Sequence, residues 1–207
     1  MKIVVLGGAG MVGKRVVERL SVGEHEIVAA SRRTGVDVLT TEGLAAAVKG
    51  ADVVIDVVNS PSFEGDVAIP FFETSTRNIL SAAADAGVRR HIVLSIVGAE
   101  RLSANGYFRA KLAQERLVEG GGLPYTILRA TQFFEFLDRI IWAGTAGDEV
   151  HIAPARVHPI AAGDAASALA DIAMARQVDG TIEIAGPDSF KLDQLVRIFM
   201  SAMNDRR

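Results

Sequence analysis

The chain has 207 residues, of which 49% are hydrophobic and 23% charged, and its formal net charge is -3. This length fits one α/β domain with a continuous core, and the balanced charge gives no sign of a nucleic-acid or membrane partner. The absence of cysteine excludes disulfides, thiolate metal sites and cysteine nucleophiles. No apolar run reaches the roughly 18 residues of a membrane helix. A strand that starts at residue 2 leaves no room for a signal peptide, so we expect a cytoplasmic protein.

The first twenty residues predict a strand, a tight turn and a helix, over 2–6 (KIVVL), 7–13 (GGAGMVG) and 14–20 (KRVVERL). In this order they form a phosphate-binding turn, in which glycines let the backbone approach a pyrophosphate. The N-terminus of the following helix offers free N–H groups and a positive dipole end to the anion. The sequence therefore predicts a bound dinucleotide.

The glycines of this turn fit two registers. Gly8, Gly10 and Gly13 match G-x-G-x-x-G, whereas Gly7, Gly10 and Gly13 match G-x-x-G-x-x-G. Features further along the chain favour the second register. We expect main-chain contacts with the cofactor at Gly7, Gly10, Met11, Val12 and Gly13.

The rest of the chain alternates short apolar strands with helices. Strands are predicted at 26–30, 36–38, 52–58, 91–97, 124–129 and 181–184, with one or two short ones within 150–160. Helices are predicted at 41–49, 67–86, 106–119, 131–142, 164–175 and 191–203. The alternation predicts a Rossmann-like, doubly wound parallel sheet covered on both faces. The rhythm changes after residue 129, so we expect one domain over 1–207, with a core at 1–135 and an interleaved, small substrate-side lobe at 136–207.

The end of the second predicted strand indicates which dinucleotide is bound. An acidic residue there, about 20 residues past the glycines, binds the ribose hydroxyls of NAD. This chain has Ser31, Arg32 and Arg33 instead. A guanidinium cannot accept a hydrogen bond from a hydroxyl, but it binds a 2′-phosphate well, and the serine adds a donor. The three residues favour NADP(H) over NAD(H), although two solvated arginines at a strand end would look the same.

Three further residues are candidates for cofactor contacts. Asp37 and Val38 lie where such folds reach the adenine edge, and a simple turn aspartate is an equal alternative. Asn59 follows the strand at 52–58, and ligands of open α/β sheets bind at the carboxyl ends of strands. We expect Asn59 to line the nicotinamide ribose.

The helix at 106–119 carries the candidate catalytic residues. Tyr107 and Lys111 are four residues apart and share one helical face, and Ser95 lies near the end of a strand. A phenol is a weak acid, but a nearby ammonium and an oxidised nicotinamide ring both favour its phenolate and lower its pKa. Tyr107 would protonate a carbonyl oxygen, Ser95 would orient it, and Lys111 would also hold the cofactor. A packed tyrosine and a serine bonded to backbone are the alternative interpretation.

Four residues are candidates for the substrate pocket: Ser60, Thr131, Gln132 and Phe133. Ser60 follows Asn59, and the other three follow the strand at 124–129 on the expected cofactor side of the sheet. Phe133 is as well explained by core packing as by an apolar pocket wall. The four histidines are scattered and predict no metal site.

These residues together resemble the short-chain dehydrogenase/reductases, and most of all their atypical, NmrA-like members. The resemblance extends over about residues 1–185. It is carried by Gly7, Gly10, Gly13, Arg32, Arg33, Asp37, the run 50–55, Ser95, Tyr107, Lys111, and the stretches 123–129 and 131–133. It implies a Rossmann-like sheet, bound NADP(H) and a substrate cleft under the C-terminal segment.

The resemblance implies two alternative functions. Some NmrA-like proteins reduce quinones or small carbonyls, and others sense the redox state of the cofactor without catalysis. Many sensors lack the tyrosine that this chain keeps as Tyr107, which favours an oxidoreductase with a small-molecule substrate. The sequence leaves open a homodimer through the helices at 65–86 and 105–119, and a regulatory protein partner.

Overall fold

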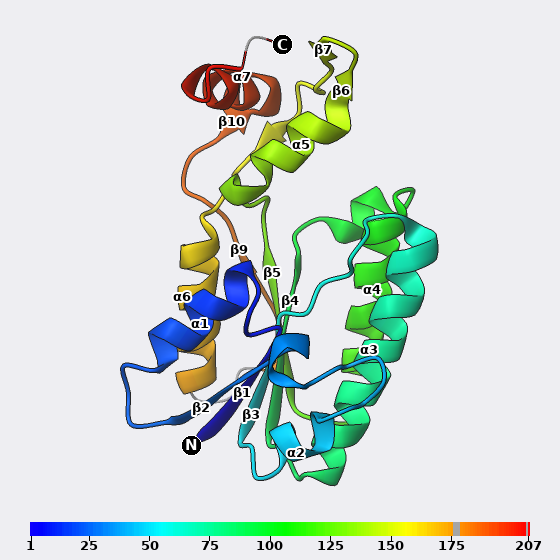
Figure 1. The fold of residues 1–207 in the computed structure, drawn as a ribbon, viewed down its shortest axis with the longest axis vertical. Coiled ribbons are helices and arrows are strands. Elements are labelled where there is room, and N and C mark those ends of the chain that lie inside the picture. The colour runs from blue at the N-terminus through cyan, green and yellow to red at the C-terminus, as the bar shows by residue number, and fades with distance from the viewer. Residues whose placement is uncertain (176–178, 206) are drawn as a thin grey trace.

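The computed structural model describes residues 1–175, 179–205 and 207. Its centre is a parallel sheet in the order β2-β1-β3-β4-β5-β9. The strands are β1 Lys2–Leu6, β2 Glu26–Ala30, β3 Val53–Asp56, β4 Arg90–Ile96, β5 Tyr125–Ala130 and β9 Gly180–Ile184. The helices are α1 Met11–Leu20, α2 Leu44–Val48, α3 Gly65–Asp85, α4 Gly106–Glu119, α5 Leu137–Gly144, α6 Ala162–Met174 and α7 Leu192–Ala202. This order confirms the predicted Rossmann-like α/β fold (Figure 1).

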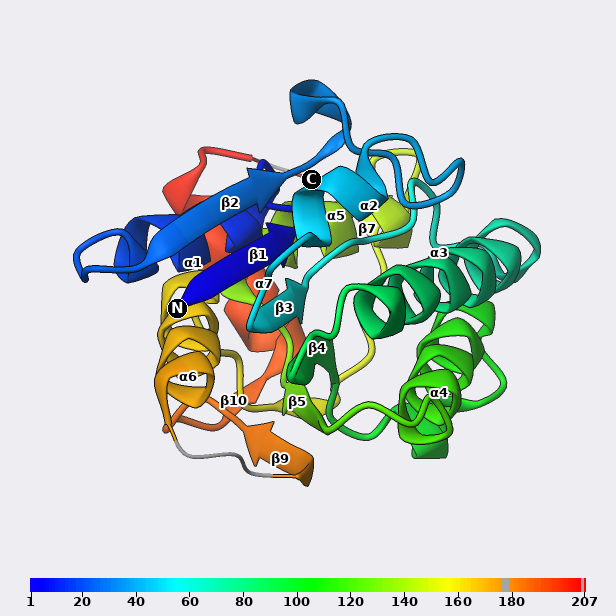
Figure 2. The ribbon, with the colours of Figure 1, turned by 90° about the horizontal axis from the view of Figure 1, so that it is seen from below.

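Helices cover both faces of the sheet, as the continuous apolar strands require. Helices α1 and α6 pack on one face, and α2, α3 and α4 lie on the other (Figure 2). The central strand β1 has Ile3 and Val5 in one core cluster and Val4 and Leu6 in the other. All four side chains are fully buried, and each contributes on the order of 2 kcal/mol of burial free energy. Among the described residues, no helix meets the length and hydropathy required to cross a bilayer.

The segment after β2 differs from the prediction, because residues 36–38 form no strand. The chain instead makes a short 3₁₀ turn, η1 Arg32–Thr34, and then a loop. The Asp37 carboxylate accepts the main-chain N–H of Leu39 at 2.8 Å, which fixes a local turn. Gly43 has a φ of +66°, so the helix predicted at 41–49 begins only at Leu44.

The helix predicted at 131–142 also begins late. Main-chain bonds join Gln132 and Phe134 to Ile160, so residues 131–133 are held in extended backbone. A 3₁₀ turn, η3 Phe134–Phe136, then leads into α5. As a result, the segment after β5 runs along the end of the sheet before it turns into the helix.

A small lobe lies beyond the carboxyl ends of β5 and β9 and is built from residues 134–157 and 190–202 (Figure 1). It contains α5, α7 and the short strands β6 Thr145–Ala146, β7 Glu149–Val150, β8 Arg156–Val157 and β10 Phe190–Lys191. Its core has Leu137 and Ile141 of α5 against Leu195, Val196 and Met200 of α7. Between its two segments, α6 and β9 return to the main sheet, so the lobe is interleaved with the Rossmann core.

Helices α3 and α4 run side by side and meet closely at their N-terminal ends (Figure 2). A methyl group added to Gly106 would lie 2.4 Å from the Cα atom of Gly65. Glycine is therefore needed at this crossing, because any side chain would push the two backbones apart. The contact brings the loop between β3 and α3 next to the first turn of α4, where Tyr107 lies.

Candidate functional site

A cavity of about 730 Å³ opens at the carboxyl ends of the central strands. Its volume is in the range of small-molecule and cofactor sites. Most of the residues predicted to form the site line it: Gly7, Gly10, Met11, Val12, Ser31, Arg32, Asp37, Val38, Asn59, Ser95, Tyr107, Lys111, Thr131, Gln132 and Phe133. Three predicted residues are not among its lining residues: Gly13, Arg33 and Ser60.

The glycine turn between β1 and α1 forms one wall of this cavity. Gly7 has a φ of +82°, and a Cβ atom there would lie 2.8 Å from the carbonyl oxygen of Val57. A Cβ atom on Gly13 would lie 2.2 Å from the Gly7 carbonyl oxygen, so Gly13 supports the turn from behind. Gly8 is also sterically required, because its Cβ would lie 2.9 Å from the Cα atom of Ala29 on β2. Gly7 and Gly8, which distinguish the two predicted registers, are therefore both sterically required, and so is Gly13, which the registers share.

The N-terminus of α1 faces the same space. The first helical bond runs from the Lys14 N–H to the Gly10 carbonyl, and the earlier N–H groups have no partner within the helix. Met11 and Val12 line the cavity, and no acidic side chain lies in the first turn. This end of the helix can therefore hold an anionic group by main-chain hydrogen bonds and by its dipole.

The far end of the cavity lies beside η1. Arg32 lines it, whereas Arg33 is exposed and is not a lining residue, so the structure brings only one of the two predicted arginines to the site. Asp37 lines the cavity, and its carboxylate also accepts the N–H groups of Leu39 and Thr40. It is thus a turn aspartate that at the same time borders the cavity.

Tyr107 and Asn59 are hydrogen-bonded to each other inside the cavity. The Tyr107 hydroxyl donates to Oδ1 of Asn59 at 2.7 Å. Burial raises the pKa of Tyr107 to about 12, and the Asn59 hydrogen bond and the charge of Arg139 only partly oppose this effect. The pKa of Tyr107 is thus shifted in the direction opposite to that expected from a neighbouring ammonium, and the phenol keeps its proton at neutral pH.

Lys111 is buried in the cavity wall, and its ammonium is bonded to protein atoms. It donates hydrogen bonds to the Leu94 carbonyl at 2.8 Å and to Oε1 of Gln114, and Gln114 in turn donates to Asp56 at 3.1 Å. Burial lowers the pKa of Lys111 to about 8, while Asp56 and Glu115 favour its charged form. The Lys111 ammonium is thus bonded within a buried network, and burial dominates the pKa of Tyr107.

Ser95 has a buried hydroxyl without a hydrogen-bond partner in the described part of the chain. It belongs to β4 and lines the cavity. A buried hydroxyl with no partner is costly, since it loses its bonds to water. The geometry therefore fits a polar ligand atom at this point of the wall.

The predicted substrate-side residues divide into two groups. Thr131, Gln132 and Phe133 line the cavity, and the Thr131 hydroxyl donates to the His158 carbonyl at 2.5 Å. Phe133 belongs at once to the sheet core and to the cavity wall. Ser60 is buried and is not a lining residue, and its oxygen accepts the N–H of Ser62 at 3.3 Å, so the structure does not bring it to the cavity.

The cavity also has lining residues that the sequence did not identify. Phe63 comes from the loop before α3, and Phe136, Arg139 and Ile140 come from the lobe. Arg139 and Ile140 of α5 follow the N-cap residue Phe136 by three and four positions, which places all three on one side of the helix. This spacing was visible in the sequence, but it could not be assigned to the cavity before the start of α5 was known.

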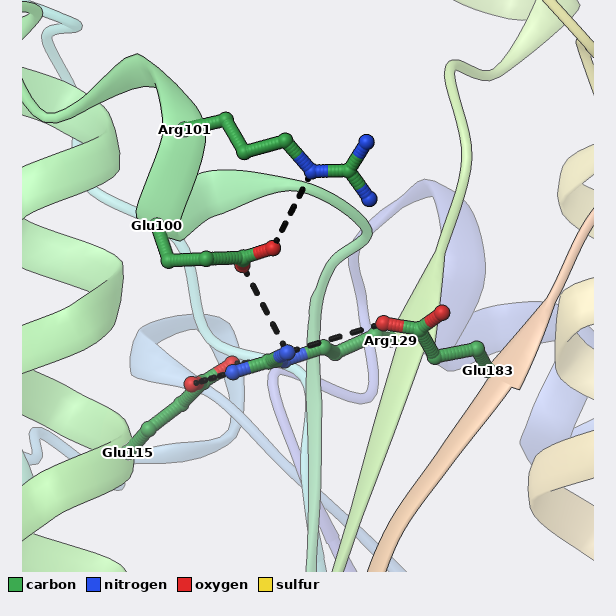
Figure 3. A network of polar contacts seen from close by, with 5 residues as sticks. All are labelled: Glu100, Arg101, Glu115, Arg129 and Glu183. Carbon is green, nitrogen blue, oxygen red and sulfur yellow. Dashed lines mark hydrogen bonds and ion pairs between the residues drawn. The ribbon is translucent and has the colours of Figure 1, made fainter.

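An ion-pair network supports the wall beside β5 (Figure 3). Arg129 forms a two-pronged contact with Glu115 of α4, at 3.0 and 2.6 Å, and lies 3.5 Å from Glu100 and from Glu183. Glu100 also pairs with Arg101. The network ties β5 to β9, to α4 and to the 3₁₀ turn η2 Ala99–Leu102, and so it fixes the loop that leads from Ser95 to Tyr107.

Comparison with known proteins agrees with this geometry. Residues 7–173 match the family described as NAD(P)H-binding. The (4-alkanoyl-5-oxo-2,5-dihydrofuran-3-yl)methyl phosphate reductase of Streptomyces griseus subsp. griseus is 30% identical over 154 residues. That match covers 68% of this chain and 50% of the reductase, so the chain spans about half the length of this relative.

Solved structures share the fold at low identity. A dTDP-4-dehydrorhamnose reductase of Clostridium acetobutylicum superposes with a TM-score of 0.78 at 18% identity, over 100% of this chain and 82% of that protein. The triphenylmethane reductase of Citrobacter sp., in complex with NADP(H), gives a TM-score of 0.72 at 18% identity, over 99% of this chain and 76% of that one. At these identities the likeness shows the fold alone.

Proposed function

Because this chain belongs to the NAD(P)H-binding family, we propose that it is an NADP(H)-dependent oxidoreductase that reduces a small carbonyl or quinone-type substrate. The observation that carries the proposal is the joint lining of one cavity by the glycine turn, by Arg32 and by the Ser95, Tyr107 and Lys111 side chains. A phosphate-binding end and a proton-donating end thus open into the same space.

The residues present fit NADP(H). The turn at Gly7 and Gly10 and the N–H groups at the start of α1 would hold the pyrophosphate, and Arg32 would hold the 2′-phosphate. Asp37 would lie toward the adenine. The bound cofactor would supply hydride to the substrate carbon. Arg32 would favour NADP(H) over NAD(H), because it stands at the end of β2, where an acidic residue would bind the ribose hydroxyls of NAD.

Tyr107 would act as the proton donor for reduction. With a pKa raised to about 12, it is protonated at neutral pH, which is the form that gives a proton to a developing alkoxide. The substrate oxygen would replace Asn59 as the acceptor of its hydroxyl. The unpartnered hydroxyl of Ser95 would orient the same oxygen. Lys111 would hold the cofactor ribose after exchanging one of its present acceptors.

The relatives support a reductase in chemical class. The Streptomyces protein is named as a reductase of a furanone, a small ring with conjugated carbonyl groups. Since the matched stretch covers half of that protein, its substrate is not transferred to this chain. The proposal therefore extends to a small carbonyl or quinone and to no particular compound.

The test is consumption of NADPH with a panel of neutral and anionic acceptors, including 9,10-phenanthrenequinone, menadione, 4-nitrobenzaldehyde and 4-carboxybenzaldehyde. We expect turnover with at least one of them, and faster with NADPH than with NADH. Tight binding of NADPH without turnover of any acceptor in the panel would contradict the oxidoreductase.

A non-catalytic redox sensor of the NmrA-like kind is the second candidate. One observation favours it. Tyr107 donates its hydrogen bond to Asn59 and Lys111 donates one to Gln114, so both side chains are bonded to other protein groups and not to each other. A sensor would bind NADP⁺ and NADPH with clearly different affinities, and Tyr107→Phe would leave that difference unchanged. Calorimetric titration of both cofactors with the wild-type protein and this variant distinguishes the two functions.

A further inference from the structure

Arg139 is a cavity-lining cation that contacts two aromatic rings. It lies on α5 at the mouth of the cavity and is exposed. Within residues 1–175, 179–205 and 207, its guanidinium makes no hydrogen bond and no ion pair. Its nearest neighbours are instead two aromatic rings, with Cζ 5.7 Å from the centre of Phe63 and 5.2 Å from the centre of Phe136. The rings fix the direction of the guanidinium but leave its N–H donors free.

The charged residues that line the cavity distinguish Arg139 from the other two cations. The lining has three cationic side chains, Arg32, Lys111 and Arg139, and one carboxylate, Asp37. Asp37 lies at the far end, beside η1, and accepts main-chain N–H groups there. Lys111 shares its charge with Asp56 through Gln114. On the substrate side, Arg139 therefore has no anionic counterpart in the wall.

Phe63 contacts both Arg139 and the proposed proton donor, Tyr107. The ring centres of Phe63 and Tyr107 are 4.7 Å apart in an edge-to-face arrangement, and Arg139 lies against the same Phe63 ring. The Tyr107 ring and the Arg139 guanidinium thus both contact the ring of Phe63. The charge of Arg139 also favours the ionised form of Tyr107, which agrees with this proximity.

We propose that Arg139 binds an anionic oxyacid group of the substrate, a carboxylate or a phosphate, and thereby selects small carbonyl compounds that carry such a group. This inference rests on the proposed function, since it names the substrate class of the same cavity. The planar guanidinium offers paired donors that match a carboxylate or phosphate edge. Phe63 and Phe136 would shield the pair from water and strengthen it, and the carbonyl would lie toward Tyr107.

The test is binding of non-reactive probes, measured by calorimetry in a buffer without phosphate. Benzoate and phenyl phosphate carry the two anionic groups, and benzyl alcohol is the neutral probe of similar size. Each is titrated into the wild-type protein, Arg139→Gln, Arg139→Lys and Arg116→Gln, with and without NADP⁺. Arg116 is the matched control, since it is an exposed arginine of α4 that does not line the cavity.

We expect at least one anionic probe to bind the wild-type protein more tightly than benzyl alcohol does. Arg139→Gln should weaken that probe by about tenfold to a hundredfold, as for the loss of a charged hydrogen bond. Arg139→Lys should retain part of the affinity, and Arg116→Gln all of it. The stronger of benzoate and phenyl phosphate identifies the preferred group.

Two results of the anion titrations would overturn the inference. One is equal affinity of the wild-type protein for the neutral and both anionic probes, and the other is an unchanged anion affinity in Arg139→Gln. NADPH affinity, measured on the same samples, separates this failure from that of the proposed function. A protein that binds NADPH but not the anions contradicts the role of Arg139 alone, whereas failure to bind NADPH contradicts the oxidoreductase. If Arg139→Gln weakens NADPH instead, Arg139 belongs to the cofactor site and the inference is also wrong.

Discussion

The Tyr107 hydroxyl and the Asn59 side chain form a 2.7 Å hydrogen bond that joins the first turn of α4 to the loop after β3. The bond depends on the close crossing of α3 and α4 at Gly65 and Gly106, which brings the two segments together. It also gives the phenol an acceptor when no substrate is bound. A substrate oxygen therefore competes with an amide oxygen for one proton, and the pocket does not have to desolvate a free hydroxyl.

Replacing Tyr107 by Phe should abolish the proposed proton transfer and little else. We expect kcat to fall by at least about 100-fold, the lower range for loss of a general acid, with NADPH affinity changed by less than about twofold. Steady-state kinetics and calorimetry measure the two quantities. Tyr125→Phe is the matched control, since Tyr125 begins β5, packs against the cluster that holds Val118, and does not line the cavity. Full activity of the Tyr107 variant would remove the phenol from the mechanism.

The two adjacent arginines after β2 should differ in their effect on the cofactor. Arg32 lines the cavity and Arg33 does not. Arg32→Ala should weaken NADPH binding by about tenfold to a hundredfold, corresponding to roughly 1.5–3 kcal/mol for a charged hydrogen bond, and leave NADH binding nearly unchanged. Arg33→Ala should change neither. Fluorescence titration of both cofactors checks this, and an equal loss of NADPH and NADH affinity in the Arg32 variant would refute a 2′-phosphate contact.

Gly13→Ala should destabilise the protein and weaken the cofactor site together. The added methyl group would lie 2.2 Å from the Gly7 carbonyl oxygen, so the turn must move. We expect a loss of roughly 1–3 kcal/mol in the free energy of unfolding, as for overpacking, along with weaker NADPH binding.

Gly163→Ala is the control for this effect. Gly163 lies in α6, and a methyl group there has no atom within 4 Å. Alanine should therefore stabilise the helix by about 0.5–1 kcal/mol without changing NADPH affinity. Urea unfolding of both variants gives the comparison. A Gly13→Ala protein as stable as the wild type would show that the turn can relax.

The buried His91 and Asp56 should have opposite effects on stability in acid. Nε2 of His91 lies 3.9 Å from Oδ2 of Asp56, and burial lowers the pKa of His91 to about 4 and raises that of Asp56 to about 6. Between pH 4 and 6.5 the unfolded chain holds a proton on His91 that the folded chain lacks, so this group makes stability rise with pH. Between about pH 4 and 6 the folded chain holds a proton on Asp56 that the unfolded chain has lost, so this group makes stability fall as the pH rises.

His91→Leu should expose the Asp56 effect. In the wild-type protein these two groups should leave the free energy of unfolding nearly constant between pH 4 and 6. In the variant the free energy of unfolding should fall by on the order of 3 kcal/mol as the pH rises from 4 to 6. Urea unfolding at several pH values measures the slope. His151→Leu is the control, because His151 is exposed and pairs only with Glu149. Parallel pH profiles of His91→Leu and the wild type would contradict a neutral, buried imidazole.

Much of the fold could be predicted because its signals are local. The alternation of apolar strands and helices gave the parallel sheet, and α4 begins and ends where the sequence predicted. The errors lie where tertiary contacts decide. The bonds from Gln132 and Phe134 to Ile160 hold an apolar segment in extended form, although its composition favours a helix.

The candidate site shows the same division. Glycine spacing and the Tyr107–Lys111 pair predicted side chains that do line one cavity. The sequence could not show that Lys111 is bonded to Gln114, because that contact depends on burial beneath β4. Nor could it separate Arg32 from Arg33, whose directions are set by the 3₁₀ turn. Arg139 was missed because an exposed arginine on a helix is usually only solvated.

The separate core of the lobe has a consequence for how such a protein can diversify. Its buried residues, including Leu137 and Met200, are distinct from those that pack against the sheet. The lobe segments leave the main domain after β5 and after β9, at the strand ends that face the cavity. Insertions, deletions or exchange of these two segments can therefore alter what enters the cavity while the sheet keeps its packing. Evolution can thus change the proposed substrate while the residues that would bind the cofactor keep their positions.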